Sequence, residues 1–307
     1  MSAERASITP PYTNRETKRE DALVGDWIRR FHPAPNAGSR LLCFPHAGGS
    51  ASVYHALSAA VAGNIEPLIV QYPGRQERLG EPFAERAEEV AAAVLAALPA
   101  PVDGTPTILF GHSMGALLAF ETARRLAAEG RAPAALFVSG RRGPSLPQWP
   151  VRRKPVSEMS DAELIEKIKQ LSGTAGELLS SPDFLPLFLP PVRADYRIVD
   201  NYVYRSAPRL DCPVTVLAGD KDPGVTVEGG RAWESETRAA FSFHLLAGGH
   251  FFLDDHLPYL ADLIASVLPE RNAGQRACST SRSDRADSRK GSTRSTTART
   301  AATDGGV

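Results

Sequence analysis

One short motif constrains the fold of this chain more than any other feature. The pentapeptide Gly-His-Ser-Met-Gly occupies residues 111–115, and its serine is Ser113. The apolar residues 107–110 before it are typical of a buried strand, and residues 114–120 after it begin an amphipathic helix. A Gly-x-Ser-x-Gly turn between a strand and a helix is a nucleophile elbow, in which the glycines leave room for a crowded backbone. The motif therefore predicts that the Ser113 hydroxyl is the nucleophile of an acyl-transfer reaction.

The elbow lies within a regular alternation of strand and helix patterns. Strands are predicted at residues 40–44, 67–72, 107–110, 134–139, 213–218 and 241–246, and helices at 53–61, 84–98, 114–129, 228–240 and 254–268. Such alternation predicts an α/β fold with a mostly parallel sheet and helices on both faces. The alternation stops between about 144 and 208, where prolines surround short helical pieces such as 161–171. This segment is predicted to be an insertion after the strand that ends near Ser139.

The two ends of the chain differ in composition from the middle. Residues 1–25 are rich in charges and prolines and are predicted to form a flexible N-terminal arm. Residues 271–307 hold eight Arg or Lys and three Asp among many Ser and Thr, with almost no large apolar residues. Such a tail cannot bury enough surface to offset its ordering entropy, so disorder is expected. Its acidic residues argue against the alternative of a nucleic-acid-binding tail. The folded domain is thus predicted at 26–270.

Composition narrows the class of protein further. The chain is 42% hydrophobic, which is enough for a sizeable core, and its formal net charge is zero. The cysteines are Cys43, Cys212 and Cys278, whose spacing matches no zinc or redox motif. The N-terminus shows no apolar signal region, and the longest apolar run, 90–98, is too short to span a bilayer. We expect a cytoplasmic protein without a bound metal or a membrane partner.

A serine nucleophile needs a general base, and chain order narrows the candidates. In this type of fold the serine is followed by Asp or Glu and then by His, each in a loop after a strand. Four of the seven histidines precede or adjoin Ser113; His244 lies in a predicted strand and His256 in the last predicted helix. His250 lies in Gly-Gly-His-Phe-Phe, directly after the last strand. It is therefore the predicted base; the alternative is a loop histidine with purely structural hydrogen bonds.

The carboxylate that orients the base should follow the preceding strand. Residues 214–219 lead into Asp220-Lys221-Asp222-Pro223, so two acidic residues compete. Asp222 is preferred because it lies further into the loop and is followed by a proline turn that can direct its side chain towards His250. Asp220 is expected to brace the loop through backbone amides, as Asp does in tight turns.

The oxyanion of the tetrahedral intermediate needs two backbone N–H donors. One should be the amide of Met114, the residue after the nucleophile. The other should come from the loop after the first predicted parallel strand, where His-Ala-Gly-Gly occupies residues 46–49. Ala47 is the predicted second donor. The alternative is that these glycines serve only chain reversal.

Several segments together resemble the type II thioesterases, the discrete editing enzymes of modular polyketide and nonribosomal peptide synthases. The similarity runs from about residue 40 to 268, and no predicted catalytic position departs from it. The segments that carry it are Leu-Cys-Phe-Pro-His-Ala-Gly-Gly at 42–49, Tyr-Pro-Gly-Arg-Gln-Glu-Arg at 72–78, the elbow at 111–116, Gly-Asp-Lys-Asp-Pro at 219–223 and Gly-Gly-His-Phe-Phe at 248–252. The elbow fits any α/β hydrolase, whereas the first two segments are much narrower signals.

This resemblance implies a function and a set of partners. Members are α/β hydrolases with a mobile helical lid after the sixth strand, and they hydrolyse acyl or aminoacyl groups from the phosphopantetheine arm of carrier proteins. Ser113 would then attack the thioester, His250 would take its proton, and Asp222 would hold the imidazole. No cofactor is implied, since the arm belongs to the substrate, and a monomer is expected. The competing interpretations are a carboxylesterase or lipase, a non-catalytic binding module, and an acyltransferase with another acceptor.

Two further predictions concern charge and the insertion. Arg75 and Arg78 could dock an acidic carrier protein or could brace a loop through salt bridges, and the sequence leaves both open. The insertion carries too many apolar residues for a solvated loop, so some should roof the acyl pocket; they include Trp149, Phe184, Leu185, Leu187, Phe188 and Leu189. Its prolines are expected to break it into short pieces that shift as a lid; they are Pro182, Pro186, Pro190 and Pro191. The alternative is a static cap.

Overall fold

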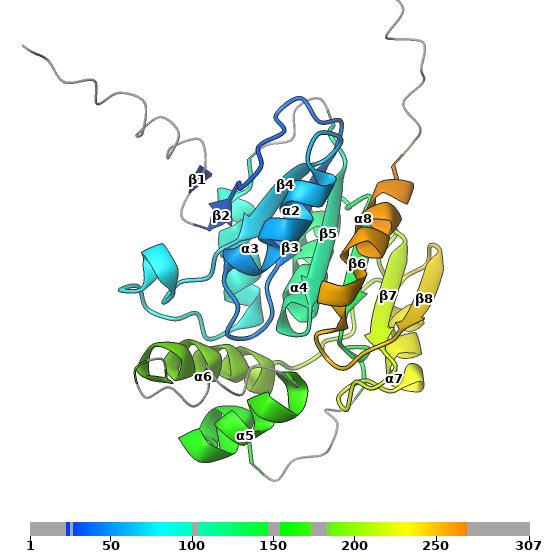
Figure 1. Cartoon of the computed structure of the whole chain (residues 1–307). Coiled ribbons are helices and arrows are strands. Elements are labelled where there is room, and N and C mark those ends of the chain that lie inside the picture. Colours follow the sequence, from blue (N-terminus) through cyan, green and yellow to red (C-terminus); the bar gives the residue numbers. More distant parts are fainter. Residues whose placement is uncertain are drawn as a thin grey trace, which may run out of the picture. The chain divides into compact units, whose positions relative to one another are not determined.

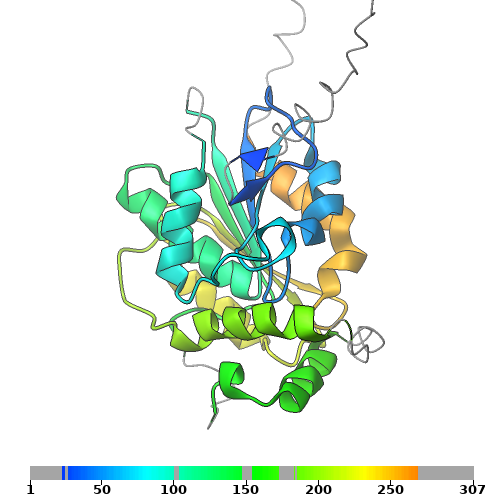
Figure 2. The same cartoon turned by 90° about the vertical axis from the view of Figure 1, so that its left-hand side faces the viewer.

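A computed structural model of the chain describes residues 23–24, 27–99, 104–146, 154–172, 183 and 185–268 (Figures 1 and 2). These residues belong to one compact unit, which ends at Leu268. Several predictions lie outside the described residues: the tail 271–307, most of the arm 1–25, and the positions of Trp149, Pro182 and Phe184.

An eight-stranded sheet forms the centre of this unit (Figure 1). The strand order is β1-β2-β4-β3-β5-β6-β7-β8, and neighbours from β4 to β8 run parallel. The strands are β1 Leu23–Val24, β2 Ile28–Arg29, β3 Arg40–Phe44, β4 Glu66–Val70, β5 Thr107–His112, β6 Ala135–Ser139, β7 Val214–Gly219 and β8 Phe241–Leu246. The predicted α/β fold with a mostly parallel sheet is confirmed.

Two short antiparallel strands at one edge were not anticipated. β1 pairs with β2, and β2 pairs with β4, both antiparallel. β1 lies within residues 1–25, the range that the sequence analysis assigned to the N-terminal arm. A two-residue strand has no room for the alternating pattern by which strands are found in a sequence.

Helices cover both faces of the sheet (Figures 1 and 2). The helices α2, His55–Val61, and α8, Leu257–Ser266, pack on one face, whereas α3, Ala87–Ala97, and α4, Met114–Ala128, pack on the other. Alternate residues of β3 serve the two cores: Leu42 faces α3 and α4, and Cys43 faces α2 and α8. Strands buried on both sides read as continuous apolar runs, which is why the sequence revealed them.

Two predicted helices are shorter than expected. The helix predicted at 228–240 is the single turn α7, Val227–Arg231, followed by the 3-10 helix η5, Ala232–Glu236. Consecutive glycines at 229 and 230 have low helix propensity. The last helix, α8, begins at Leu257 after the 3-10 helix η6, Phe252–His256, because Pro258 suits the first turn of a helix. His256 thus lies in η6, before the last helix.

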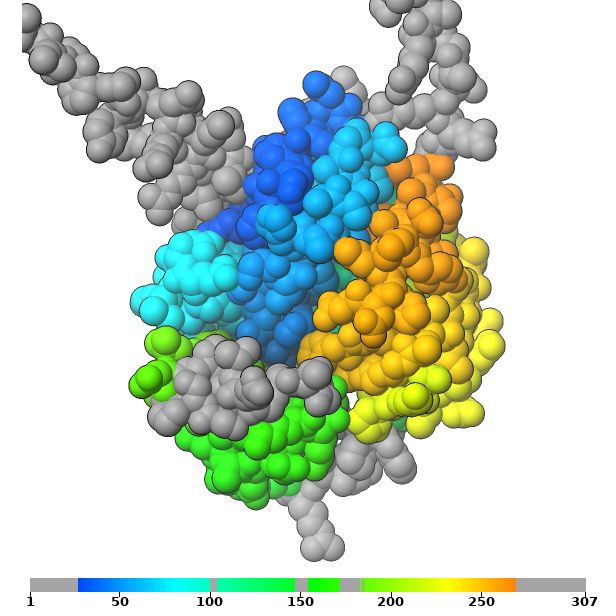
Figure 3. Space-filling model, viewed as in Figure 1, coloured from blue at the N-terminus to red at the C-terminus, as the bar shows by residue number. Residues whose placement is uncertain are grey.

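The predicted insertion follows β6 and contains η3, Val156–Glu158, α5, Asp161–Ser172, and α6, Leu185–Asn201. We call these three elements the lid. They gather at the lower edge of the molecule in Figure 3, coloured green. Buried side chains from all three form a small core of their own; they are Val156, Leu164, Leu189 and Val192. The lid helices are therefore held to one another by apolar packing.

The prediction that prolines break the insertion into short pieces is wrong for α6. This helix runs unbroken through Pro190 and Pro191, and Pro186 is its second residue. A proline in the first turn removes no hydrogen bond, whereas the other two each remove one. Burial of Leu189, Val192 and Ile198 holds the helix together despite that loss. Across the described part of the chain, helices long and apolar enough to cross a membrane are absent.

Candidate active site

Ser113 occupies a sharp turn between β5 and α4. Its backbone angles are φ 56° and ψ −113°, a conformation that non-glycine residues rarely adopt. The glycines on either side are sterically required: a Cβ on Gly111 would lie 2.1 Å from the Gly115 carbonyl oxygen, and one on Gly115 would lie 1.9 Å from that of Phe44. The strained turn places Ser113 at the carboxyl end of the central strand, as in a nucleophile elbow.

His250 and Asp222 meet at the ends of the two last strands. Nδ1 of His250 lies 2.8 Å from Oδ2 of Asp222, and both residues are buried. The other carboxylate oxygen of Asp222 accepts a hydrogen bond from the Gly224 N–H at 2.8 Å. The structure thus brings Asp222 to the imidazole. Asp220 is exposed and accepts from the Gly248 N–H at 2.8 Å, so it braces the two loops against each other.

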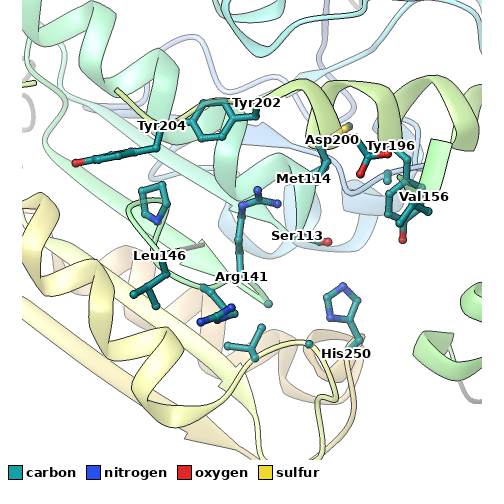
Figure 4. A pocket seen from close by; sticks show the side chains of 18 of the residues that line it. Ser113, Met114, Arg141, Leu146, Val156, Tyr196, Asp200, Tyr202, Tyr204 and His250 are labelled. Atoms are coloured by element: carbon teal, nitrogen blue, oxygen red, sulfur yellow. The ribbon is translucent and has the colours of Figure 1, made fainter. Parts of the chain in front are cut away.

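Ser113 and His250 line one cavity of about 550 Å³ (Figure 4). Met114 and Ala47, the predicted oxyanion donors, line it too. The lid provides much of the remaining wall; its contributing residues are Val156, Lys167, Leu171, Tyr196, Val199 and Asp200. A cavity of this volume suits a small organic group. Both the predicted nucleophile and the predicted lid line it.

The predicted oxyanion donors come from two different elements. Met114 is the first residue of α4, where backbone N–H groups have no helical acceptor. Ala47 lies in the loop 46–49, which we call the oxyanion loop. Within this loop the Gly48 N–H donates to Asp195 at 2.7 Å, and the Gly49 N–H donates to the His46 carbonyl at 2.9 Å. These two amides are engaged elsewhere, and Ala47 stays the predicted second donor.

Two further histidines surround His250, and the sequence analysis set both aside. The rings of His112 and His250 have centroids 4.9 Å apart, and Nδ1 of His112 lies 3.0 Å from the Ser139 hydroxyl. Burial, with smaller effects of His250 and His46, holds the pKa of His112 well below its usual value. Burial also lowers the pKa of His46. Both are neutral at pH 7, so they add no fixed charge beside the base.

The cavity also contains positive charge that the sequence analysis missed. Arg141 and Arg142 follow β6 after Gly140, and both line the cavity; Figure 4 shows Arg141 there. Burial lowers the pKa of Arg141 to about 10, which still leaves it charged at pH 7. Tyr202 and Tyr204 also line the cavity; the Tyr202 hydroxyl donates a hydrogen bond to Glu121, and the Tyr204 hydroxyl donates one to Glu236. The position of the two arginines at the carboxyl end of a strand is the signal that could have revealed them.

Arg75 and Arg78 brace loops. Each is 6% exposed. Arg75 forms a two-pronged ion pair with Asp195, and Arg78 pairs with Glu81 and donates to the Gln71 carbonyl. The structure therefore supports loop bracing for both arginines. Each guanidinium is paired with a carboxylate of this chain and does not offer its charge to a carrier protein.

Within the part of the chain that the structure describes, the cysteines and acidic groups show no further reactive centre. Burial raises the pKa of the Cys43 thiol and raises that of Cys212 to about 11, so both are protonated at pH 7. Cys278 lies outside the described residues. Among the residues with described positions, no group of three or more His, Cys, Asp or Glu side chains is arranged to hold a metal ion.

The chain is similar in sequence to known thioesterases. The family model described as "Thioesterase domain" matches residues 39–268. The chain is 45% identical to the thioesterase PikA5 of Streptomyces venezuelae over 80% of this chain and 86% of that protein. It is 42% identical to a probable cadicidin biosynthesis thioesterase of Streptomyces griseus, over 88% of this chain and 76% of that protein.

Solved structures give the same result. The type II thioesterase BorB, from the borrelidin biosynthetic cluster, superimposes with a TM-score of 0.73 at 42% identity, over 81% of this chain and 99% of that one. YbtT, a type II thioesterase from the yersiniabactin pathway, superimposes with a TM-score of 0.69 at 30% identity, over 79% and 98%. BorB and YbtT thus share the fold with this chain over nearly the whole of their own length.

Proposed function

Because the chain belongs to the type II thioesterases of polyketide and nonribosomal peptide biosynthesis, α/β hydrolases that act on carrier-bound substrates, we propose roles for its individual residues. Ser113 is the nucleophile, His250 the general base and Asp222 the carboxylate that orients it. The observation that carries this proposal is the 2.8 Å contact between His250 and the buried Asp222, at the cavity that Ser113 lines.

The chemistry follows from this arrangement. Asp222 accepts a hydrogen bond from the Nδ1–H group of His250, which leaves the unprotonated Nε2 to take the hydroxyl proton of Ser113. The serine oxygen attacks the thioester carbonyl, and the thiol leaves with the proton that His250 returns. Water then attacks the acyl-serine with His250 again as the base, and His250 returns that proton to the Ser113 oxygen as the acid is released. The buried carboxylate stabilises the imidazolium at both stages.

The oxyanion formed in both steps takes hydrogen bonds from the amides of Met114 and Ala47. Donors fixed in a site that excludes water stabilise developing charge more than solvent does, because they need no reorganisation. The N-terminal end of α4 adds its dipole to the same stabilisation.

The substrate is an acyl or aminoacyl group on the phosphopantetheine arm of a carrier protein, and its removal clears misprimed or stalled synthases. The thioesterase uses no cofactor of its own, because the arm arrives with the carrier, and it acts as a monomer. The lid roofs the cavity, so the arm lies between lid and body. Contacts with the arm and the carrier surface should give carrier-bound acyl groups a much higher kcat/KM than the same groups on N-acetylcysteamine.

One set of variants tests the residue roles. Ser113→Ala should abolish turnover and keep the fold, with a loss of about 10⁴ to 10⁶ in rate. Asp222→Asn should cripple hydrolysis, whereas Asp220→Asn, its matched control two residues away, should act mainly on the melting temperature. A Ser113→Ala protein with a tenth of wild-type activity would refute the nucleophile assignment. The reverse pattern in the two Asp variants would move the orienting role to Asp220.

A substrate comparison tests the reaction class. Carrier proteins loaded with short acyl or aminoacyl groups are followed by mass spectrometry with and without enzyme, next to p-nitrophenyl esters of the same acids. Loss of acyl mass from the carriers at low enzyme concentration is the expected result. Equal kcat/KM on carriers, N-acetylcysteamine thioesters and free esters would instead indicate a general esterase.

The catalytic unit should be complete within residues 26–270. The family match ends at 268, and the basic tail 271–307 lies beyond it. Truncation after residue 270 should leave the melting temperature and the kcat/KM on carrier substrates nearly unchanged. A large loss of either would give the tail a role in folding or in carrier binding.

A further inference from the structure

A buried carboxylate joins the lid to the oxyanion loop. Asp195 lies in α6, and only 2% of its surface is exposed. Its Oδ2 accepts a hydrogen bond from the Gly48 N–H at 2.7 Å. Gly48 follows Ala47 directly, so a side chain of the lid holds the peptide next to the proposed oxyanion donor.

Arg75 neutralises this carboxylate and fixes its orientation. Its Nη1 and Nη2 atoms donate to Oδ2 and Oδ1 of Asp195 at 2.6 and 2.8 Å. Nη1 also donates to the Gly49 carbonyl at 3.1 Å. The guanidinium therefore contacts the lid and the oxyanion loop together. A two-pronged pair with additional backbone bonds allows little movement of the carboxylate.

The same face of α6 also touches the loop sterically. A Cβ added to Gly48 would lie 2.5 Å from Cγ2 of Val192, which is one helical turn before Asp195. Gly48 has a φ of +78°, in the region that favours glycine. The Val192 side chain thus packs directly against the loop at Gly48, and the backbone of the loop is held by both a hydrogen bond and van der Waals contact.

We propose that Asp195, held by Arg75, is a positioning residue for hydrolysis: it fixes the oxyanion loop so that the Ala47 amide faces the developing oxyanion. The inference rests on the proposed roles of Ser113 and Ala47 and adds that the lid helix is part of the machinery that forms the oxyanion hole. Fixing the Gly48 N–H limits rotation of the Ala47–Gly48 peptide, and thereby sets the position of the preceding amide. A shift of about 1 Å in a catalytic group can cost about a hundredfold in rate.

The test uses Asp195→Asn with Glu66→Gln as a matched control. Glu66 is also a buried carboxylate that pairs with one arginine, Arg30, and accepts from one backbone amide, that of Ala34. It begins β4 and so lies at the amino end of the strands, away from the cavity. Both variants are measured for melting temperature, for kcat and KM on one acyl thioester, and for the affinity of an alkylboronic acid. The serine oxygen adds to boron, and a boronate oxygen then occupies the oxyanion position.

The proposal expects a specific pattern. Asp195→Asn should lower kcat about a hundredfold, with KM within about threefold, and should weaken the boronic acid by a similar factor. Glu66→Gln should lower the melting temperature and leave both quantities within about threefold. Equal effects of the two variants on kcat, or a boronic acid affinity that Asp195→Asn does not change, would overturn the proposal and leave Asp195 a structural residue.

Arg75→Lys keeps the experiment informative if Asp195→Asn does not fold. Lysine preserves the charge and loses the two-pronged geometry, so an intermediate loss of kcat and of boronic acid affinity is expected. Wild-type values for both quantities in a folded Arg75→Lys protein would count against the proposal. Failure of this inference differs from failure of the proposed function: an active Ser113→Ala protein refutes the latter, whereas an inactive Ser113→Ala with a fully active Asp195→Asn refutes only the former.

Discussion

The two long lid helices are attached to the enzyme in different ways. The helix α6 contacts the body through the Asp195–Arg75 pair and through Ile198, whose side chain joins the core beneath α3 and α4. The helix α5 buries Leu164 only within the small core of the lid, and its ion pairs with Lys154 and Arg193 are exposed. One segment of sequence thus holds an anchored helix and a peripheral one.

The two lid helices should therefore differ in how easily they move. Movement of α6 would break a buried ion pair and disturb the oxyanion loop, at a cost of several kcal/mol. Movement of α5 would expose only a few apolar side chains and weak surface ion pairs. If the cavity opens to admit the pantetheine arm, we expect α5 to move and α6 to stay.

The largest effect should come from cutting the core contact of α6. Ile198→Ala removes a side chain that is 2% exposed, and we expect a loss of about 2–5 kcal/mol in the free energy of unfolding. Urea denaturation followed by circular dichroism measures it. A loss below about 1 kcal/mol would mean that α6 is no better anchored than α5, and the comparison would fail.

Acid should act on the body before it acts on α5. An unfolded histidine titrates near pH 6.5, and the pKa of buried His112 is well below that value because of burial and the neighbouring His250 and His46. Below pH 6.5 the unfolded state therefore binds more protons, and stability falls by about 1.4 kcal/mol per pH unit for each such histidine until its folded pKa is reached.

Urea denaturation between pH 7.5 and 5 tests this prediction. His112→Gln removes one titrating group and should flatten the slope. Hydrogen exchange of the α5 amides, corrected for the intrinsic effect of pH, should not follow the same slope. A stability that stays constant down to pH 5 would show that the buried histidines take up protons at little cost in the folded protein.

Leu164→Ala should have a smaller global effect than Ile198→Ala although Leu164 is fully buried. We expect α5 to open locally while the rest of the protein stays folded. The substitution can then lower the global free energy of unfolding by no more than the free energy of this local opening. We expect less than about 2 kcal/mol in urea denaturation, with faster hydrogen exchange confined to α5. In the wild type, amides of α5 should exchange faster than those of α6. Equal protection of the two helices would favour a static cap.

The smallest effect is expected at the surface of the lid. Asp161 pairs with Arg193 at 2.6 Å, and its side chain is 70% exposed. Asp161→Asn should cost less than about 1 kcal/mol and leave kcat unchanged, since exposed ion pairs contribute little. A loss of activity here, comparable to that of Asp195→Asn, would show that α5 also positions catalytic groups.

Sequence patterns could locate what is local. The parallel strands are short apolar runs, and the elbow is a pentapeptide with a strict steric requirement, so both were found from the sequence. The positions of Asp222 and His250 followed from one rule, that such residues come directly after strands of a parallel sheet. The structure brings these two side chains together from elements that are adjacent in the sheet.

Sequence patterns could not locate what depends on distant partners. Arg75 and Asp195 are 120 positions apart, and nothing near either one indicates that they pair. The continuity of α6 through Pro190 and Pro191 depends on tertiary packing, which overrides the local effect of proline. The short strand β2 pairs with the edge of β4, and β1 pairs in turn with β2, so both depend on residues distant in sequence and their own residues carry no signal.

The contacts of α6 have a consequence for directed evolution of acyl selectivity. A first set of its residues, Val192 and Asp195, abuts the oxyanion loop, whereas a second set, Tyr196, Val199 and Asp200, lines the cavity. Libraries that randomise the second set can reshape the cavity while the loop keeps its support. If Asp195 positions the oxyanion loop as proposed, libraries that include the first set should yield mostly inactive variants, whatever acyl group is offered. Adjacent residues of a single helix, such as Asp195 and Tyr196, should thus affect different properties, the first the rate of hydrolysis and the second the choice of acyl group.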